Sequence, residues 1–169
     1  MGAKRADGDQ SPDGRISNLF VYGTLLPGDV RFHLLKPFIV DDGWPDRIAG
    51  QLFDTGEDYP AAVLSTRTAS MIVGNTYALL RASLSEALSV LDEVEGVVAG
   101  NYRRIPVTTE SGVQAWVYEG GGGLPLRRIP GGDWLAHRPP HLPRTQLSLP
   151  ATSWPGRVSA ADPRQRCPA

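Results

Sequence analysis

Short runs rich in apolar residues dominate this chain, and several of them alternate apolar with polar positions, which is the period of a β-strand. Glycine, proline and polar turn residues separate the runs, so we expect many short strands. The pair Gly74-Asn75 is expected to break one run, and Glu110-Ser111-Gly112 is expected to form a hairpin turn. The predicted strands cover residues 18–23, 48–54, 61–64, 70–80, 102–109 and 113–118.

One segment has helical periodicity instead. Between residues 83 and 95 the apolar residues recur every three or four positions, which predicts an amphipathic helix. Ser83 with Glu86 is the pattern of a capping box at its start, and Gly96 suits its end. A shorter helix is expected over residues 30–36, before a proline. The apolar stripe of the main helix consists of Leu84, Ala87, Leu88, Leu91 and Val94.

A single main helix among many short strands predicts an α+β domain built on a curled sheet or a small barrel. We expect this domain to occupy residues 17–136. Residues 1–16 are polar and aperiodic, which predicts a disordered leader. Residues 121–169 contain nine of the fifteen prolines, so residues 137–169 are expected to form a disordered tail rich in proline and arginine.

Composition narrows the class of protein. Of the 169 residues, 41% are hydrophobic and 21% are charged, as in an ordinary globular domain. No run of about 18 apolar residues is present, and the polar N-terminus lacks the apolar core of a secretory signal, so we expect no membrane association. The single cysteine, Cys167, cannot form an internal disulfide, which favours a cytoplasmic location. The three histidines lack metal-ligand spacing, so no metal site is expected.

Charge argues against nucleic acid as a partner. The net charge is −1, although residues 121–169 hold seven arginines against two aspartates. An RNA- or phosphate-binding module that uses this basic segment is one alternative. No basic patch with interleaved aromatic residues supports it. The sequence does not specify an oligomeric state.

Glu95 is the first residue that suggests chemistry. At about 100° per residue, its side chain lies within roughly 40° of the apolar stripe, whereas Glu93 points away from it. A carboxylate that faces the core at a helix C-terminus should have a raised pKa, because burial and the helix dipole both disfavour its charge. Such a group suits proton transfer near neutral pH. The alternative is that the helix frays before Glu95 and the side chain reaches solvent.

A second feature follows the first predicted strand. Gly23 ends this strand, and Pro27-Gly28 forms a turn soon afterwards. Backbone N–H groups beside such a glycine can receive a carboxylate or carbonyl oxygen of a ligand. The segment lacks the pattern of a P-loop or of a dinucleotide-binding loop. Taken alone, it fits a simple connection equally well.

Six short motifs between residues 18 and 135 resemble those of the γ-glutamylcyclotransferase-like family, in the same order, with bacterial γ-glutamylamine cyclotransferases as the most similar type. Val21-Tyr22-Gly23-Thr24-Leu25 resembles the family's Tyr-Gly-Ser/Thr-Leu loop. Leu91-Asp92-Glu93-Val94-Glu95-Gly96-Val97 is similar to its Leu-Asp-x-x-Glu-Gly segment. The other four are Tyr59-Pro60-Ala61, Tyr102-Arg103-Arg104, Trp116-Val117-Tyr118 and Ile129-Pro130-Gly131-Gly132-Asp133-Trp134.

The resemblance implies a small mixed β-barrel with flanking helices and a cyclising enzyme that needs no cofactor. The substrate would be a small γ-glutamyl compound, whose own α-amino group attacks its γ-amide carbonyl and releases 5-oxoproline and an amine or amino acid. Glu95 would be the general acid and base. The expected substrate-binding residues are Tyr22, Gly23, Thr24, Leu25, Tyr59 and Tyr102.

A different class of function stays open beside this one. The same fold could serve as a non-catalytic domain that binds a small metabolite or a protein. A pure binding domain has no need of a carboxylate on an apolar stripe, because such a group costs stability. Glu95 therefore favours the enzyme.

Overall fold

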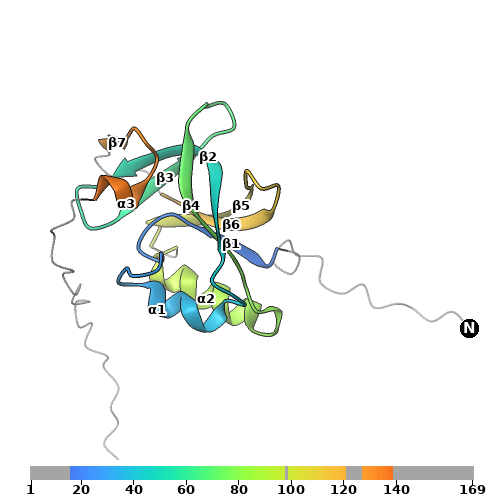
Figure 1. Ribbon diagram of the computed structural model, residues 1–169. Helices are drawn as coiled ribbons and strands as arrows, with labels where there is room; N and C mark the ends of the chain where they lie inside the picture. The colour runs from blue at the N-terminus through green and yellow to red at the C-terminus, as the bar shows by residue number, and fades with distance from the viewer. Residues whose placement is uncertain (1–15, 98, 121–126, 139–169) are drawn as a thin grey trace, which may run out of the picture.

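The structure is a computed structural model that describes residues 16–97, 99–120 and 127–138 (Figure 1). Seven strands in these ranges form one sheet in the order β3-β2-β4-β1-β6-β5, with β7 paired to β2. The β1–β6 pair is parallel and the other pairs are antiparallel. The strands are β1 (Asn18–Val21), β2 (Trp44–Asp54), β3 (Pro60–Leu64), β4 (Met71–Ala78), β5 (Tyr102–Thr108), β6 (Gln114–Gly120) and β7 (Arg127–Ile129).

Short helices flank this sheet. In Figure 1, α1 and α2 lie together beneath the sheet, and α3 lies beside β7, away from them. No helix in the described ranges is long and apolar enough to cross a membrane. The helices are α1 (Phe32–Leu35), α2 (Leu84–Val94) and α3 (Trp134–His137), with 3-10 turns η2 (Lys36–Phe38) and η3 (Arg81–Ser83).

The mixed sheet curls into a half-barrel, which confirms the expected α+β fold. Polar side chains bridge the gap between β3 and β6. The Tyr22 hydroxyl donates to the Tyr118 carbonyl at 2.6 Å and accepts from the Ala62 N–H at 3.3 Å. The Glu119 carboxylate accepts from the Leu64 N–H at 2.9 Å. These bonds satisfy backbone groups that a fully paired barrel would satisfy by strand pairing.

The strands bury side chains on both faces. On β1, Leu19 and Val21 belong to one hydrophobic cluster and Phe20 to another, as the two-residue period of a strand requires. The first cluster includes Leu84, Leu88 and Leu91 of α2, so the predicted apolar stripe packs against the sheet. The same packing brings the end of α2 towards the end of β1.

The ends of the main helix were predicted to within one residue, but the predicted capping box at its start was wrong. Ser83 makes no side-chain capping bond, and its φ and ψ are −118° and 18°. The turn η3 already coils the chain before α2, so the Ser83 hydroxyl does not face the helix N–H groups. The predicted stop is confirmed, because Gly96 has a φ of +64° directly after the helix.

One predicted break in the chain was also wrong. Gly74 does not interrupt β4. It lies beside the end of β1, which pairs with β4, and a Cβ there would clash with the Val21 carbonyl oxygen. The short helix expected before Pro37 is present as α1, and Pro37 follows it inside η2, near the start of that turn, where a missing N–H costs nothing.

Other differences lie at element ends. The hairpin turn at residues 110–112 is confirmed, with Gly112 at a φ of +81°. Strand β2 begins four residues earlier than expected, and the short elements β7 and α3 were missed. The predictions of a disordered leader and tail concern residues that, apart from 16, 137 and 138, lie outside the described ranges.

Candidate active site

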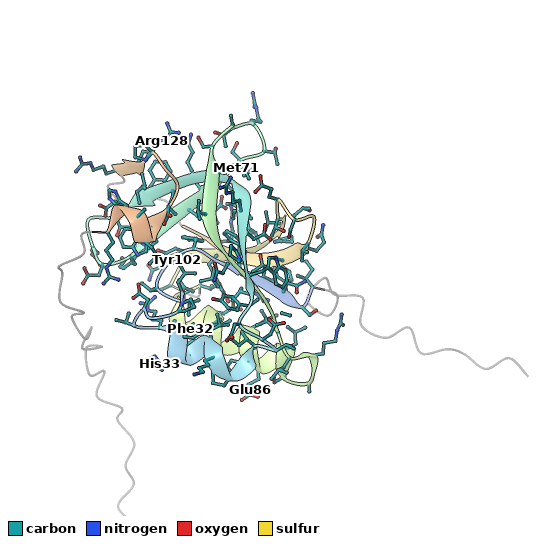
Figure 2. The ribbon with its side chains drawn as sticks, in the orientation of Figure 1. Phe32, His33, Met71, Glu86, Tyr102 and Arg128 are labelled. Atoms are coloured by element: carbon teal, nitrogen blue, oxygen red, sulfur yellow. The ribbon has the colours of Figure 1, made fainter. Side chains whose placement is uncertain are left out.

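A cavity lies where β1 ends, between the sheet and the helices. Its empty space, including the open mouth, is about 370 Å³. Tyr102, labelled in Figure 2, lies on the sheet side facing α1 and α2. The cavity is lined by Phe20, Val21, Tyr22, Gly23, Thr24, Leu25, Arg31, Tyr59, Pro60, Glu95, Tyr102 and Tyr118.

Glu95 enters this cavity from the end of α2. Its N–H still donates to the Leu91 carbonyl at 2.9 Å, so the residue keeps a helical position. After it, the Gly96 N–H donates to the Glu93 carbonyl and the Val97 N–H to the Asp92 carbonyl, which is the Schellman motif. The helix therefore does not fray before Glu95. Its side chain is only 9% exposed, whereas Glu93 is exposed.

Burial dominates the electrostatics of Glu95. Desolvation raises the pKa of its carboxyl from the ordinary 4.5 to about 7, although the nearby positive charge of Arg31 acts to lower it. The Arg31 Nη1 lies 3.9 Å from the Glu95 Oε1. A group with this pKa exists in both protonation states at neutral pH, so it can accept a proton and return it.

A polar network holds the last turn of α2 in place. The Asp92 carboxylate accepts a hydrogen bond from the Tyr118 hydroxyl at 2.8 Å and lies 3.1 Å from the Arg104 Nε. Asp92 stands one helical turn before Glu95, on the same side of the helix. Because β5 and β6 supply its two partners, the sheet fixes the position from which Glu95 extends.

The turn after β1 forms the opposite wall. The Leu26 N–H donates to the Gly23 carbonyl at 2.9 Å, and the Arg31 N–H donates to the Thr24 carbonyl at 3.1 Å. In the described part of the chain, no group accepts a hydrogen bond from the N–H of Gly23, Thr24 or Leu25. A Cβ on Gly23 would be 2.9 Å from Pro60, so the wall requires glycine there. These N–H groups can receive an oxygen atom of a ligand.

Two tyrosine hydroxyls in the cavity already donate their hydrogens to backbone carbonyls, so they cannot donate to a ligand without breaking these bonds. The Tyr102 hydroxyl donates to the Pro60 carbonyl at 2.7 Å, and the Tyr22 hydroxyl donates to Tyr118. Burial raises the pKa of both phenols, so they stay protonated. The Tyr102 oxygen can still accept a hydrogen bond from a ligand, whereas the Tyr22 hydroxyl both donates to the Tyr118 carbonyl and accepts from the Ala62 N–H. Tyr59 packs edge-on against Tyr102, with ring centroids 6.4 Å apart.

All seven residues expected at the site line this one cavity. The sequence analysis missed Arg31, because no motif marks it and it lies in a loop whose path only the fold decides. It also left Tyr118 without a role, although Tyr118 lies in one of the quoted motifs. Arg31 is the one cationic side chain that lines the cavity in the described ranges.

Comparisons with known proteins find solved structures with a similar fold. The crystal structure of YkqA from Bacillus subtilis has 27% sequence identity and a TM-score of 0.56, covering 72% of this chain and 40% of YkqA. The structure of PH0828 from Pyrococcus horikoshii has 28% identity and a TM-score of 0.53, covering 71% of this chain and 94% of PH0828.

A mouse AIG2-like protein shares the fold, with 22% identity and a TM-score of 0.50 over 68% of this chain and 86% of that protein. No protein with a curated description matches the chain. The family model described as "Gamma-glutamyl cyclotransferase, AIG2-like" matches residues 19–136. This match covers more than half of the chain and includes both walls of the cavity, so the chain belongs to the γ-glutamyl cyclotransferase, AIG2-like family.

Proposed function

We propose that this protein is a γ-glutamyl cyclotransferase that converts a small γ-glutamyl compound into 5-oxoproline and a free amine or amino acid. One observation carries the proposal: the Glu95 carboxyl, with a pKa of about 7, lies in the same cavity as the open N–H groups of the turn after β1. The family of the chain supports this class of reaction.

The reaction needs no nucleophile from the protein. The α-ammonium of the substrate gives a proton to Glu95, and the freed nitrogen attacks the γ-carbonyl carbon. A new C–N bond closes the five-membered ring, and the original amide C–N bond breaks as Glu95 gives its proton to the departing nitrogen. The second proton of the attacking nitrogen then passes through the Glu95 carboxylate to the released amine, which leaves as an ammonium, so that the lactam nitrogen keeps one hydrogen. One carboxyl group thus serves as base and then as acid.

Positioning supplies the rest of the catalysis. The substrate chain must fold back on itself, and a fitted cavity removes much of that entropic cost. The N–H groups of Gly23, Thr24 and Leu25 are placed to hold the substrate carboxylate or the oxyanion that develops on the carbonyl. Arg31 adds a positive charge to the cavity lining, which favours a substrate with a free carboxylate.

The direct test is product analysis. The purified full chain, incubated with a library of γ-glutamyl amides and peptides, should release 5-oxoproline detectable by mass spectrometry. Glu95→Gln should lower the rate by about 100-fold or more, since glutamine cannot exchange the proton. Glu93→Gln is the matched control, because Glu93 lies at the same helix end but is exposed. Equal rates for Glu95→Gln and the unchanged protein would reject this role.

The main alternative is a non-catalytic binding domain of the same fold. It predicts that γ-glutamyl compounds raise the melting temperature without being consumed. Thermal-shift measurements on the same library therefore separate the two functions. Stabilisation with no 5-oxoproline across the library would favour the binding domain.

A further inference from the structure

The last described residues of the chain contact two loops whose residues line the cavity. The Arg138 Nη1 lies 2.8 Å from the Asp29 Oδ2, two residues before Arg31. The His137 Nε2 lies 3.1 Å from the Asp54 Oδ2, at the start of the loop that leads to Tyr59. Two consecutive residues at the end of α3 thus join two separate loops.

The contact at Asp29 is buried. The Asp29 side chain is 3% exposed, and its other hydrogen bond comes from the Val30 N–H at 2.7 Å. In the described ranges Arg138 is its one ion-pair partner. A buried carboxylate that loses its partner is strongly disfavoured, so the loop would rearrange to hydrate it.

Helix α3 offers a firm base for this contact. Trp134 is 4% exposed and belongs to the hydrophobic cluster that includes Ile129 and Leu52. The Asp133 side chain caps the helix by accepting from the Ala136 N–H at 3.0 Å. Arg138 is therefore anchored to the sheet through α3, and Asp29 is anchored through Arg138.

We propose that Arg138 is a positioning residue of the cavity. Through Asp29 it holds the loop that precedes α1, so that the Arg31 guanidinium stays in the cavity lining beside Glu95. Arg138 itself lines no part of the cavity. The link between Arg138 and Arg31 rests on the contacts alone, and only its effect on turnover depends on the proposed function.

Two variants test this role. Arg138→Gln removes the positive charge. Asp29→Asn with Arg138→Gln removes both charges, so it avoids a lone buried carboxylate and protects folding. The matched control is Arg128→Gln, which also removes one arginine hydrogen bond, the 2.8 Å contact with the Ser70 hydroxyl. Arg128 lies at the far end of the molecule from α1 (Figure 2).

The first measurement is the pKa of Glu95. It is obtained by recording the NMR signals of [¹³C]carboxyl-labelled glutamate in the full chain over a series of pH values. Arg31 acts to lower the pKa of Glu95, so releasing Arg31 should raise it. Both test variants should show the rise, Arg128→Gln should not, and Arg138→Lys should restore much of the original value. Adding Arg31→Gln to Arg138→Gln should cause no further rise, because both changes remove the same interaction.

The second measurement is turnover. If Arg31 helps to bind substrate, both test variants should raise KM by about tenfold and change kcat by less than about twofold, because they weaken binding of the ground state and the transition state alike. A Glu95 titration that is unchanged in the folded test variants would overturn the proposal. The titration needs no substrate, so this result stays separate from any failure of the proposed function.

Discussion

Glu95 is held in a state that costs the folded protein stability. In the unfolded chain its carboxyl ionises near 4.5, and in the folded chain burial raises the pKa to about 7. The folded state therefore binds more protons than the unfolded state between these two values, and stability falls as pH rises through that window. Such a cost is typical of a group that function retains.

This cost predicts how Glu95→Gln behaves. Above pH 7 the variant should be more stable than the unchanged protein by about 3 kcal/mol, which is the shift of about 2.5 pKa units converted at 1.36 kcal/mol each. Near pH 4 the two should be almost equally stable, because Glu95 is then protonated in both states. Chemical denaturation at a series of pH values measures the difference. A gain that does not depend on pH would show that folding does not shift the pKa of Glu95.

The pKa of Glu95 also sets the pH dependence of turnover. Because the base form must accept the first proton, kcat/KM should rise with pH and level off above about 7.

The apolar stripe was enough to predict the burial of Glu95. It could not reveal Arg31, because a residue 64 positions earlier reaches Glu95 only through the packing of α1 against α2.

At the scale of elements, the end of α2 decides where Glu95 points. Gly96 adopts a φ of +64°, and a Cβ there would lie 2.8 Å from the Asn101 side-chain nitrogen. Gly96→Ala should therefore lower the free energy of unfolding by about 1–2 kcal/mol. It should also reduce kcat/KM in the fraction that stays folded, because the Schellman turn that holds Glu95 is disturbed.

Gly112→Ala is the matched control for this variant. Gly112 also has a positive φ, +81°, but a Cβ there meets nothing within 4 Å, and it lies at the tip of the β5–β6 hairpin. Gly112→Ala should lower the free energy of unfolding by about 1 kcal/mol through backbone strain alone and leave kcat/KM unchanged. Equal losses of activity in the two variants would mean that the end of α2 has no special part in the site.

Local signals predicted most elements and failed where a neighbouring element intervened. Short apolar or β-rich runs and alternating segments together located six of the seven strands, and the helical period located α2. Gly74 was taken for a break because a glycine in a strand usually weakens it. A glycine is needed at this position because β1, which is more than fifty residues away in the chain, approaches β4 closely there.

At the scale of the whole molecule, Asp46 joins three parts of the fold. Its carboxylate, on β2, accepts hydrogen bonds from the Thr76 hydroxyl on β4 at 3.0 Å and from the Ser111 hydroxyl at 2.7 Å. Burial acts to raise the pKa of Asp46, but these hydrogen bonds and others outweigh it and lower the pKa to about 2. The charged form thus holds the β5–β6 hairpin against the sheet.

Asp46→Asn should therefore lower the free energy of unfolding at pH 7 by about 2 kcal/mol, which corresponds to the lowered pKa. In the unchanged protein this contribution is complete above about pH 4 and is lost as pH falls through about 2. Acid-unfolding curves should accordingly be flatter for Asp46→Asn. The exposed Asp42 gives the control, Asp42→Asn, which should behave like the unchanged protein; equal curves for both variants would contradict the role of Asp46.

The sequence by itself determined the kind of fold, the main helix with its stop at Gly96, and the core-facing side of Glu95, because each depends on residues a few positions apart. Only the tertiary structure decided how the residues that line the cavity contact one another and which further residues join them. It placed Arg31 beside Glu95, directed the Tyr22 and Tyr102 hydroxyls to backbone carbonyls, and brought Arg138 to Asp29 across more than one hundred residues. Such contacts follow from how the sheet curls and where its loops pack, which no short stretch of sequence encodes.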